Sequence, residues 1–243
     1  MGKIYVVGIG PGDKAFMTDR AKKVLNECDI IVGYRAYTDI VKAYYPEKEY
    51  MESAMKQEID RCRACVDLAN SGKIVALICS GDAGIYGMAS PLYETAQKMG
   101  FDDVEIIPGI TAASSGAALL GAPINHDFCV ISLSDLLTPW ELIENRIRCA
   151  SKGDFSIVIY NPSSHKRADY LKKACDIMLT EISPDTVCGY VKNIGRDGTE
   201  MNVCTLKELA EKQVDMFTTV FIGNSNTKMI NKKMVTPRGY ENK

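Results

Sequence analysis

Short apolar runs alternate with helical stretches along the whole chain, and this alternation limits the folds that are open to it. The runs have the length of strands and are rich in β-branched residues, at 4–8, 30–33, 74–80, 104–107, 129–133, 156–160, 186–191 and 218–223. The helical stretches between them lie at 19–27, 56–70, 90–99, 139–149, 166–179 and 206–213. Such alternation predicts an α/β fold with mainly parallel sheets.

The alternation pauses once, near residues 116–125. The stretch SSGAALLGAP there is typical of a helix end followed by a turn, after which the strand–helix series starts again. A chain of 243 residues is long enough for two medium-sized domains. We therefore expect two α/β domains, residues 1–118 and 119–243, with a cofactor cleft between them.

Composition excludes several classes of function. The net charge of −2 gives no basic face for nucleic acid, and no apolar stretch is long enough to span a membrane. The nine cysteines are scattered and follow no secretion signal, so we expect reduced thiols in a cytoplasmic protein. Cys62 and Cys65 form the only CxxC pair. Because no second pair follows, packing in a helix is the favoured interpretation and no metal site is expected.

Four turns follow apolar runs and carry small or polar residues, at 8–13, 81–87, 108–113 and 160–164. Ligands of open α/β sheets bind beyond the carboxyl ends of the strands, where these turns lie. Glycine lets the backbone approach a ligand closely, and Asp82 is the only carboxylate in the GDAGIYGMA stretch. A small zwitterion joined to a nucleoside would suit such a site.

The first turn, GIGPGD, also suggests a dinucleotide site, but the match is weak. The fingerprint needs a glycine where Asp13 stands and an acid after the second strand, where Tyr34 and Arg35 stand. No phosphate-binding GxxxxGK[ST] loop is present. An NAD(P)-dependent oxidoreductase and a non-catalytic binding module remain the alternatives.

The same turns resemble the three N-terminal motifs of the tetrapyrrole methylases, which are S-adenosylmethionine-dependent enzymes of two α/β domains. Most members have Gly-Asp-Pro in the second motif, whereas this chain has Gly-Asp-Ala. GDAGIYGMA, VGYRAY, LGAPINHDFC, ISLSDLLTPW, YNP and TPRGY resemble the branch that methylates C-17 of precorrin-3B or cobalt-factor III in cobalamin biosynthesis. The resemblance runs from residue 3 to residue 240.

The resemblance implies a homodimer that binds S-adenosylmethionine and releases S-adenosylhomocysteine, with a tetrapyrrole substrate that is cobalt-bound or metal-free. A methylase acting on another ring carbon is the closest alternative. We expect no iron–sulfur cluster. The implied cofactor-binding residues are Pro11, Gly81, Asp82, Ile85, Thr111, Ala112, Asn161, Asn193, Ile194, Phe217 and Thr218.

The implied reaction couples methylation to ring contraction, which moves protons. His126, Asp13 and Tyr34 are therefore the predicted catalytic residues, with His165 a lesser candidate. The substrate carries many carboxylates, which suit Arg35, and Ser132 and Asp135 lie in the branch-specific stretch ISLSDLLTPW, so these three residues are predicted to bind substrate. Further candidate cations for these carboxylates are Lys166, Arg167, Lys192 and Arg196.

Overall fold

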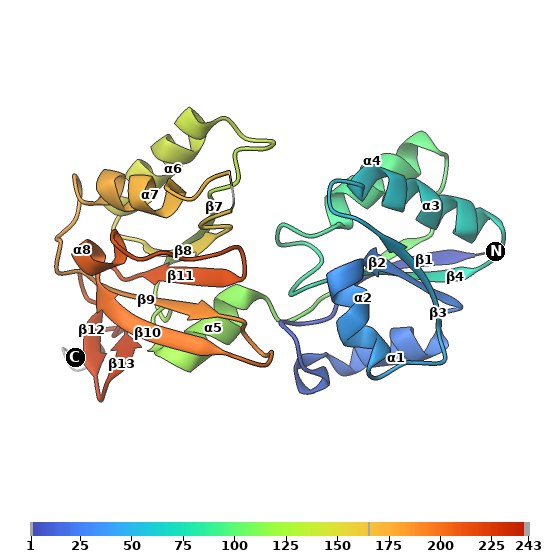
Figure 1. The fold of residues 1–243 in the computed structure, drawn as a ribbon, viewed down its shortest axis with the longest axis horizontal. Helices are drawn as coiled ribbons and strands as arrows, with labels where there is room; N and C mark the ends of the chain where they lie inside the picture. Colours follow the sequence, from blue (N-terminus) through green and yellow to red (C-terminus); the bar gives the residue numbers. More distant parts are fainter. Residues whose placement is uncertain (1, 165, 241–243) are drawn as a thin grey trace. The chain divides into compact units, whose positions relative to one another are not determined.

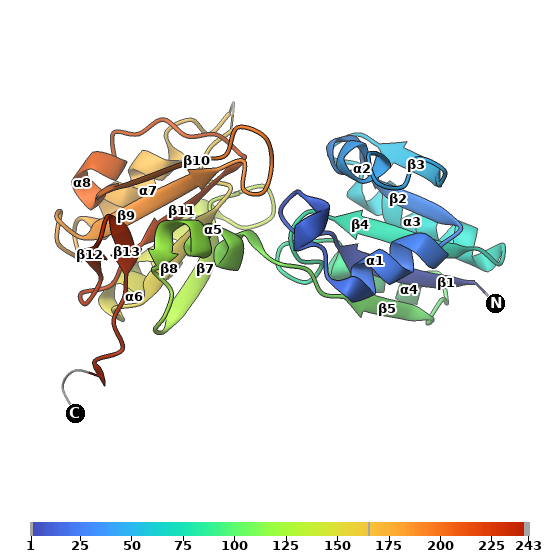
Figure 2. The same cartoon turned by 90° about the horizontal axis from the view of Figure 1, so that it is seen from below.

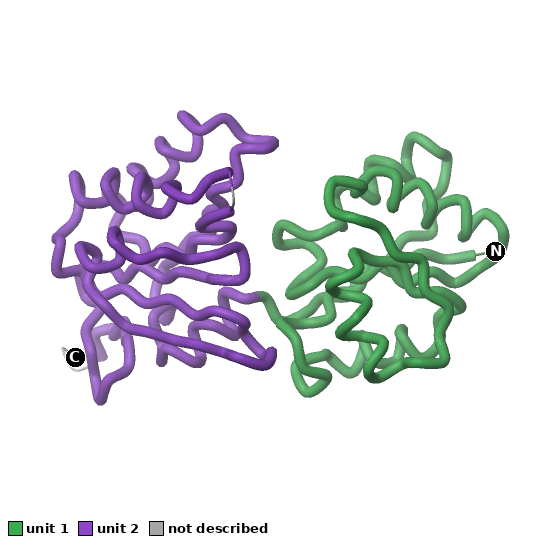
Figure 3. The backbone as a smooth tube through the Cα atoms, viewed as in Figure 1, with its two compact units in different colours: residues 1–111 green, residues 112–243 purple. Residues whose placement is uncertain are grey.

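The computed structural model describes residues 2–164 and 166–240 (Figure 1). The chain divides into two compact units, residues 1–111 and 112–243 (Figure 3). The expected junction at 118/119 falls inside helix α5 (Ala112–Leu120), which belongs to the second unit. The helix packs there because Ala113, Ala117 and Leu120 are buried against the second sheet.

The first unit is a five-stranded parallel sheet in the order β3-β2-β4-β1-β5. The elements are β1 (Lys3–Gly8), η1 (Lys14–Phe16), α1 (Asp19–Glu27), β2 (Ile30–Tyr34), α2 (Arg35–Lys42), β3 (Glu49–Ser53), α3 (Glu58–Asn70), β4 (Ile74–Cys79), α4 (Ala89–Lys98) and β5 (Val104–Ile107). The expectation of a parallel α/β sheet is confirmed here. Sequence patterns missed β3, because it is an edge strand with mostly exposed side chains.

Both faces of this sheet are buried, which explains why its strands are continuously apolar. Val6 and Leu77 lie in the core beneath α3 and α4, and Val7 and Ile78 lie in the core beneath α1 and α2. Successive residues of a strand point to opposite faces, so a strand covered on both sides needs apolar residues at every position.

Cys62 and Cys65 lie in the core beneath α3, as the packing interpretation of the CxxC pair predicts. Burial raises the pKa of the Cys62 thiol to about 11, and it raises the pKa of Cys65 as well. Both side chains therefore behave as small apolar groups at neutral pH.

The second unit has a five-stranded sheet in the order β10-β9-β11-β8-β7. Its elements after α5 are β6 (Gly121–Ala122), β7 (Phe128–Ser132), α6 (Trp140–Lys152), β8 (Ser156–Tyr160), α7 (Tyr170–Met178), β9 (Val187–Lys192), β10 (Glu200–Thr205), α8 (Leu206–Leu209), β11 (Thr218–Ile222), β12 (Lys228–Ile230) and β13 (Lys233–Val235). Only β7 and β8 pair in parallel in this sheet, and the other three pairings are antiparallel. The expectation of mainly parallel pairing therefore fails for this sheet. The cause is β10, an edge strand with an exposed first half that forms a hairpin with β9.

Helices cover both faces of the second sheet (Figures 1 and 2). Ile157 and Ile159 of β8 point into the core shared with α6, α7 and α8, whereas Val158 between them points into the core shared with α5. Among the described residues, no helix is long and apolar enough to cross a membrane.

The C-terminal TPRGY stretch begins with a buried hydroxyl that holds the small sheet of β12, β13 and β6. Thr236 is fully buried, and its Oγ1 donates to the Pro123 carbonyl at 2.6 Å. The Thr227 hydroxyl oxygen lies 2.7 Å from Thr236 Oγ1. These bonds fix residues 233–236 beside β6, which pairs with β13 in parallel.

We expect Thr236→Val to lower the free energy of unfolding by about 1–3 kcal/mol, because it leaves the buried Pro123 carbonyl without its donor and removes one hydrogen-bond partner of the Thr227 hydroxyl. Chemical denaturation followed by circular dichroism measures this change. Thr236→Ser, which keeps the hydroxyl, is the control and should lose much less. Equal stability of the valine variant and the native protein would contradict the proposed role of the hydroxyl.

Candidate functional site

Three glycine-bearing loops meet at the carboxyl edge of the first sheet because they follow three neighbouring strands, β4, β1 and β5. Gly10 and Gly81 join two of these loops through a pair of backbone hydrogen bonds. The Gly81 N–H donates to the Gly10 carbonyl at 2.8 Å, and the Gly10 N–H donates to the Gly81 carbonyl at 3.1 Å. The loops after β1 and β4 therefore form one continuous backbone surface.

The loops lie too close together for side chains. A Cβ atom on Gly109 would stand 2.1 Å from the Gly81 carbonyl oxygen. Gly81 also has a φ of +69°, a conformation that favours glycine over other residues. Glycine is therefore needed at these positions, because a side chain would collide with the neighbouring backbone. The polar surface of this edge consists mainly of main-chain groups.

Asp82 fixes the shape of this edge. Its Oδ1 accepts hydrogen bonds from the Gly84 and Ile85 N–H groups at 2.8 and 3.1 Å. Its Oδ2 accepts from the Gly109 N–H at 2.9 Å, which ties the loop after β4 to the loop after β5. Asp82 was expected to contact a ligand, and the structure assigns its carboxylate three bonds within the protein.

The other predicted residues of the first unit lie at the same edge. Pro11 is buried in the first loop, Ile85 is 40% exposed at the tip of the second, and Thr111 follows the third. Asp13 caps η1, where its carboxylate accepts from the Ala15 N–H at 2.7 Å.

Tyr34 and Arg35 stand at the junction of β2 and α2, so they lie at the same edge of the sheet. The Tyr34 ring meets the Tyr37 ring edge to face, with their centroids 5.3 Å apart. Arg35 is exposed. The structure thus brings the predicted residues of the first unit together.

The first glycine turn lacks the geometry of a dinucleotide site. In that motif the turn opens directly into a helix whose N-terminus holds the pyrophosphate. Here the short helix η1 follows the turn, and α1 begins only at Asp19. This placement counts against the oxidoreductase alternative.

The second unit gathers its predicted residues at one edge of its own sheet. Ser132 at the end of β7 pairs with Tyr160 at the end of β8. Thr218 begins β11 beside Lys192 at the end of β9, because these two strands are antiparallel. The Asn161 amide, just beyond β8, donates to the Ser132 hydroxyl at 2.9 Å. Residues from four strands therefore share this edge.

Two asparagines turn the chain at this edge. Asn161 and Asn193 have φ values of +52° and +51°, which asparagine tolerates better than most residues. The Asn193 N–H donates to the carbonyl of Phe217 at 3.1 Å, and the Phe217 ring is 47% exposed. Ile194 is only 7% exposed and packs in the core.

Sequence patterns missed Asp215, and they assigned Tyr160 to a turn and a motif without a role for its hydroxyl. Asp215 accepts hydrogen bonds from Lys192 Nζ and Thr218 Oγ1, both at 3.0 Å. Burial raises the pKa of this carboxyl, but the hydrogen bonds outweigh burial and hold the pKa below its usual value. The Tyr160 hydroxyl accepts from the Ala113 N–H at 2.7 Å and so holds the first turn of α5, where Ala112 lies. No spacing rule in the sequence links Asp215 with Lys192 or Tyr160 with Ala113, whereas Thr218 stands only three residues after Asp215.

Asp135 belongs to a polar cluster just beyond β7. The Tyr170 hydroxyl donates to Asp135 Oδ2 at 2.6 Å, and Arg167 Nη1 lies 3.5 Å from Oδ1. The hydrogen bond to Asp135 raises the pKa of Tyr170. The carboxylate predicted to bind substrate is therefore engaged within the protein.

His126 lies apart from these residues. It precedes β7 and is 45% exposed, and its Nδ1 accepts from the Asp127 N–H at 2.8 Å. The Asp127 carbonyl in turn accepts a hydrogen bond from the N–H of Ser156, the first residue of β8. His126 therefore stands at the opposite edge of the second sheet from Ser132 and Asn161. His165 is outside the described residues.

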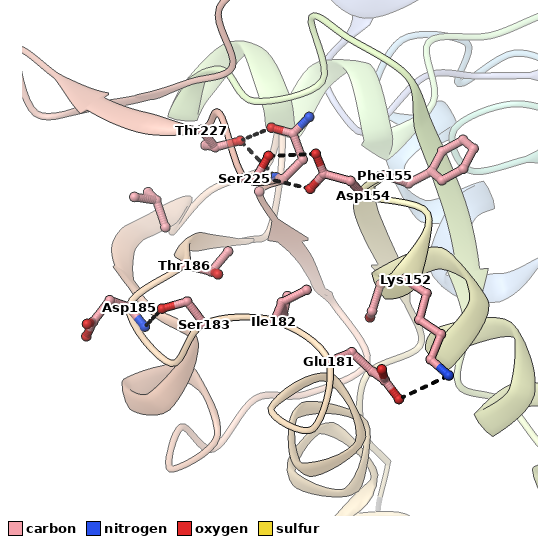
Figure 4. A pocket seen from close by; sticks show the side chains of 14 residues that line it. Lys152, Asp154, Phe155, Glu181, Ile182, Ser183, Asp185, Thr186, Ser225 and Thr227 are labelled. Carbon is pink, nitrogen blue, oxygen red and sulfur yellow. Dashed lines mark hydrogen bonds and ion pairs between the residues drawn. The ribbon is translucent and has the colours of Figure 1, made fainter.

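A cavity of about 650 Å³ also lies at that opposite edge (Figure 4). Three of its charged side chains, Lys152, Asp154 and Glu181, are paired within the protein. Asp154 accepts from the N–H and hydroxyl of Ser225, and Glu181 pairs with Arg148 and Lys152. The cavity therefore adds no residue to the predicted site.

The chain matches the family model "Tetrapyrrole (Corrin/Porphyrin) Methylases" over residues 3–210. A protein from Salmonella typhimurium with the name "Probable cobalt-factor III C(17)-methyltransferase" is 48% identical over 98% of this chain and 99% of its own length. A "Cobalt-factor III methyltransferase" from Priestia megaterium is 43% identical over the full chain, which spans 46% of that longer protein.

Solved structures share the fold. The structure of the methyltransferase CobJ is 33% identical, with a TM-score of 0.89 over 98% of this chain and all of that one. A uroporphyrin-III C-methyltransferase from Thermus thermophilus, solved with S-adenosylhomocysteine, is 21% identical, with a TM-score of 0.72 over 91% of this chain and 97% of its own. The α/β fold class and the resemblance noted in the sequence are thereby confirmed, and the chain belongs to the tetrapyrrole methylase family.

Proposed function

We propose that this protein transfers a methyl group from S-adenosylmethionine to C-17 of cobalt-factor III, with contraction of the ring, in cobalamin biosynthesis. The observation that carries the proposal is the glycine edge of the first sheet, built from the family's three motifs. The names of the full-length relatives support cobalt-factor III as the substrate. The chain spans only 46% of the Priestia megaterium protein. The proposal therefore covers no activity of the rest of that longer protein.

The residues of the first unit fit the methyl donor. A side chain on Gly109 would collide with the Gly81 carbonyl, so the edge offers a surface of backbone groups to a ligand. The loop of residues 80–88 would hold the methionine part and ribose of the donor, with its shape set by Asp82. The exposed Ile85 side chain would add an apolar contact.

The donor, when bound, supplies a methyl group that its sulfonium already activates. The residues of the chain therefore have mainly to bind and align the two reactants, which accounts for much of the rate in such transfers. At the edge of the second sheet, Asn193 and Ile194 would hold the adenine through backbone groups. The exposed Phe217 ring would stack on the base.

Ring contraction requires proton movement, and Asp13 and Tyr34 are the proposed groups for it. Both lie at the carboxyl edge of the first sheet with the glycine loops. Arg35 is exposed beside them and would pair with a carboxylate of the substrate.

We also propose that the protein forms a homodimer. Analytical ultracentrifugation of the purified protein tests this proposal.

The central experiment incubates the protein with cobalt-factor III and labelled S-adenosylmethionine and follows the products by mass spectrometry. We expect a labelled, contracted product. A product methylated at another carbon would favour a different methylase of the pathway. Binding of NADH at micromolar concentration, with no response to S-adenosylmethionine, would overturn the proposal.

We expect Gly81→Ala to weaken binding of S-adenosylhomocysteine roughly tenfold or more, because its φ of +69° strains any side-chain-bearing residue at the proposed ligand surface. Calorimetric titration measures this affinity. Gly100→Ala is a matched control: its φ is +71°, it has open space around the added Cβ, and it follows α4 away from this edge. Equal affinities for both variants would remove Gly81 from the site.

We expect Phe217→Ala to lower the same affinity about tenfold through loss of a stacking surface. Phe128→Ala is the control, since Phe128 is 44% exposed at the opposite edge of the same sheet. Weaker binding by Phe217→Ala, with unchanged binding by Phe128→Ala, would support a role of Phe217 in cofactor binding. Unchanged binding by Phe217→Ala would exclude its edge of the second sheet from the cofactor site.

We expect His126→Gln to keep the yield of contracted product near that of the native protein, because His126 lies at the edge away from the other predicted residues. The predicted role as a proton carrier would instead lower the rate roughly 10²-fold. The ratio of contracted to uncontracted methylated product separates these results. A loss of that size in the glutamine variant, with unchanged cofactor affinity, would restore His126 to the catalytic set.

A further inference from the structure

The loop after β7 exposes two adjacent leucines. Leu136 is 67% exposed and Leu137 is 98% exposed, the latter nearly as open as a side chain can be. Single exposed apolar residues are common on protein surfaces. Two exposed leucines in succession at a loop tip are less usual, because exposing apolar side chains to water is less favourable than exposing polar ones. Exposed apolar surface of this kind is typical of binding sites.

The two ends of this loop are held firmly. At its start, the Leu133 N–H donates to the Tyr160 carbonyl at 2.9 Å, and the Leu133 side chain is fully buried. Asp135 accepts the Tyr170 hydroxyl at 2.6 Å. At its far end, Trp140 packs on the Tyr170 ring with centroids 4.6 Å apart. The leucines therefore lie on a loop that is anchored at both ends.

The loop starts at the edge of the second sheet that carries the predicted site. Ser132, the last residue of β7, accepts the Asn161 amide and also the Ser134 N–H. The leucines thus follow closely on the residues proposed to bind substrate and cofactor. Arg167 lies beside the loop, with its Nη1 3.5 Å from Asp135 Oδ1.

We propose that Leu136 and Leu137 bind the apolar face of the tetrapyrrole substrate. This inference rests on the proposed function. A tetrapyrrole is a broad apolar ring with carboxylates around its rim, so its apolar face matches two exposed leucines beside the edge that is proposed to bind substrate. Binding would remove apolar surface of the leucines and of the ring from water, which favours the complex. Leu136 and Leu137 would then set affinity for the tetrapyrrole and leave affinity for the methyl donor unchanged.

The test is the double variant Leu136→Ser with Leu137→Ser. We expect its KM for cobalt-factor III to rise about 10- to 100-fold, as the loss of one or two buried apolar side chains implies. The affinity for S-adenosylhomocysteine and the midpoint of thermal unfolding should stay at the native values, because Leu137 has almost no contacts to lose. The double variant with methionine at both positions should recover most of the substrate affinity.

Met229→Ser is the control, since Met229 is 52% exposed on β12 and lies outside the proposed site. If the native protein fails to methylate cobalt-factor III, the proposed function itself is wrong. If the native protein is active and the serine variant keeps its KM, this inference alone is overturned. A change of oligomeric state in the serine variant, with unchanged KM, would identify the loop as a contact between two copies of the chain.

Discussion

The bonds of the Asp82 carboxylate determine the form of the carboxyl edge of the first sheet. One oxygen closes the loop that follows β4, and the other reaches the Gly109 N–H beyond β5. A carboxylate that accepts several backbone N–H groups holds them more strongly than a neutral side chain would. The glycines can then meet backbone to backbone, and the family motifs become one surface. Without this carboxylate the loop after β5 would lose its hydrogen bond to the loop after β4, and the Gly10–Gly81 pair would still join the loops after β1 and β4.

The second unit builds its edge by another means. In its mixed sheet the ends of β7, β8 and β9 lie at the same edge as the start of β11, because β11 runs antiparallel to β9. In the first unit, parallel pairing alone brings the strand ends to one edge. Asparagines with positive φ reverse the chain after β8 and β9, where the first unit uses glycines. Side chains therefore contribute more to this edge, as the contact between Asn161 and Ser132 shows.

The sequence predicted those features that leave a local pattern. The buried parallel strands are continuous apolar runs, and the glycine loops follow them directly, so the first unit and its edge were foreseeable. The edge strands β3 and β10 carry mostly exposed or half-buried side chains and escaped detection. The ion pair of Asp215 with Lys192 depends on pairing between β9 and β11, and the hydrogen bond of Tyr160 with Ala113 joins residues far apart in the chain. Such relations are tertiary, and no spacing in one sequence reveals them.

The parallel pairing of β13 with β6 has a consequence for the order in which the chain folds. The first unit closes entirely within residues 1–111, so its five strands are all available once that segment has been synthesised. In the second unit, residues 121–122 await a partner strand more than a hundred residues further along the chain. Domains fold as units during synthesis, with the N-terminal one first. The first unit can therefore be complete on the ribosome while the second still lacks the strand and the buried threonine that finish it.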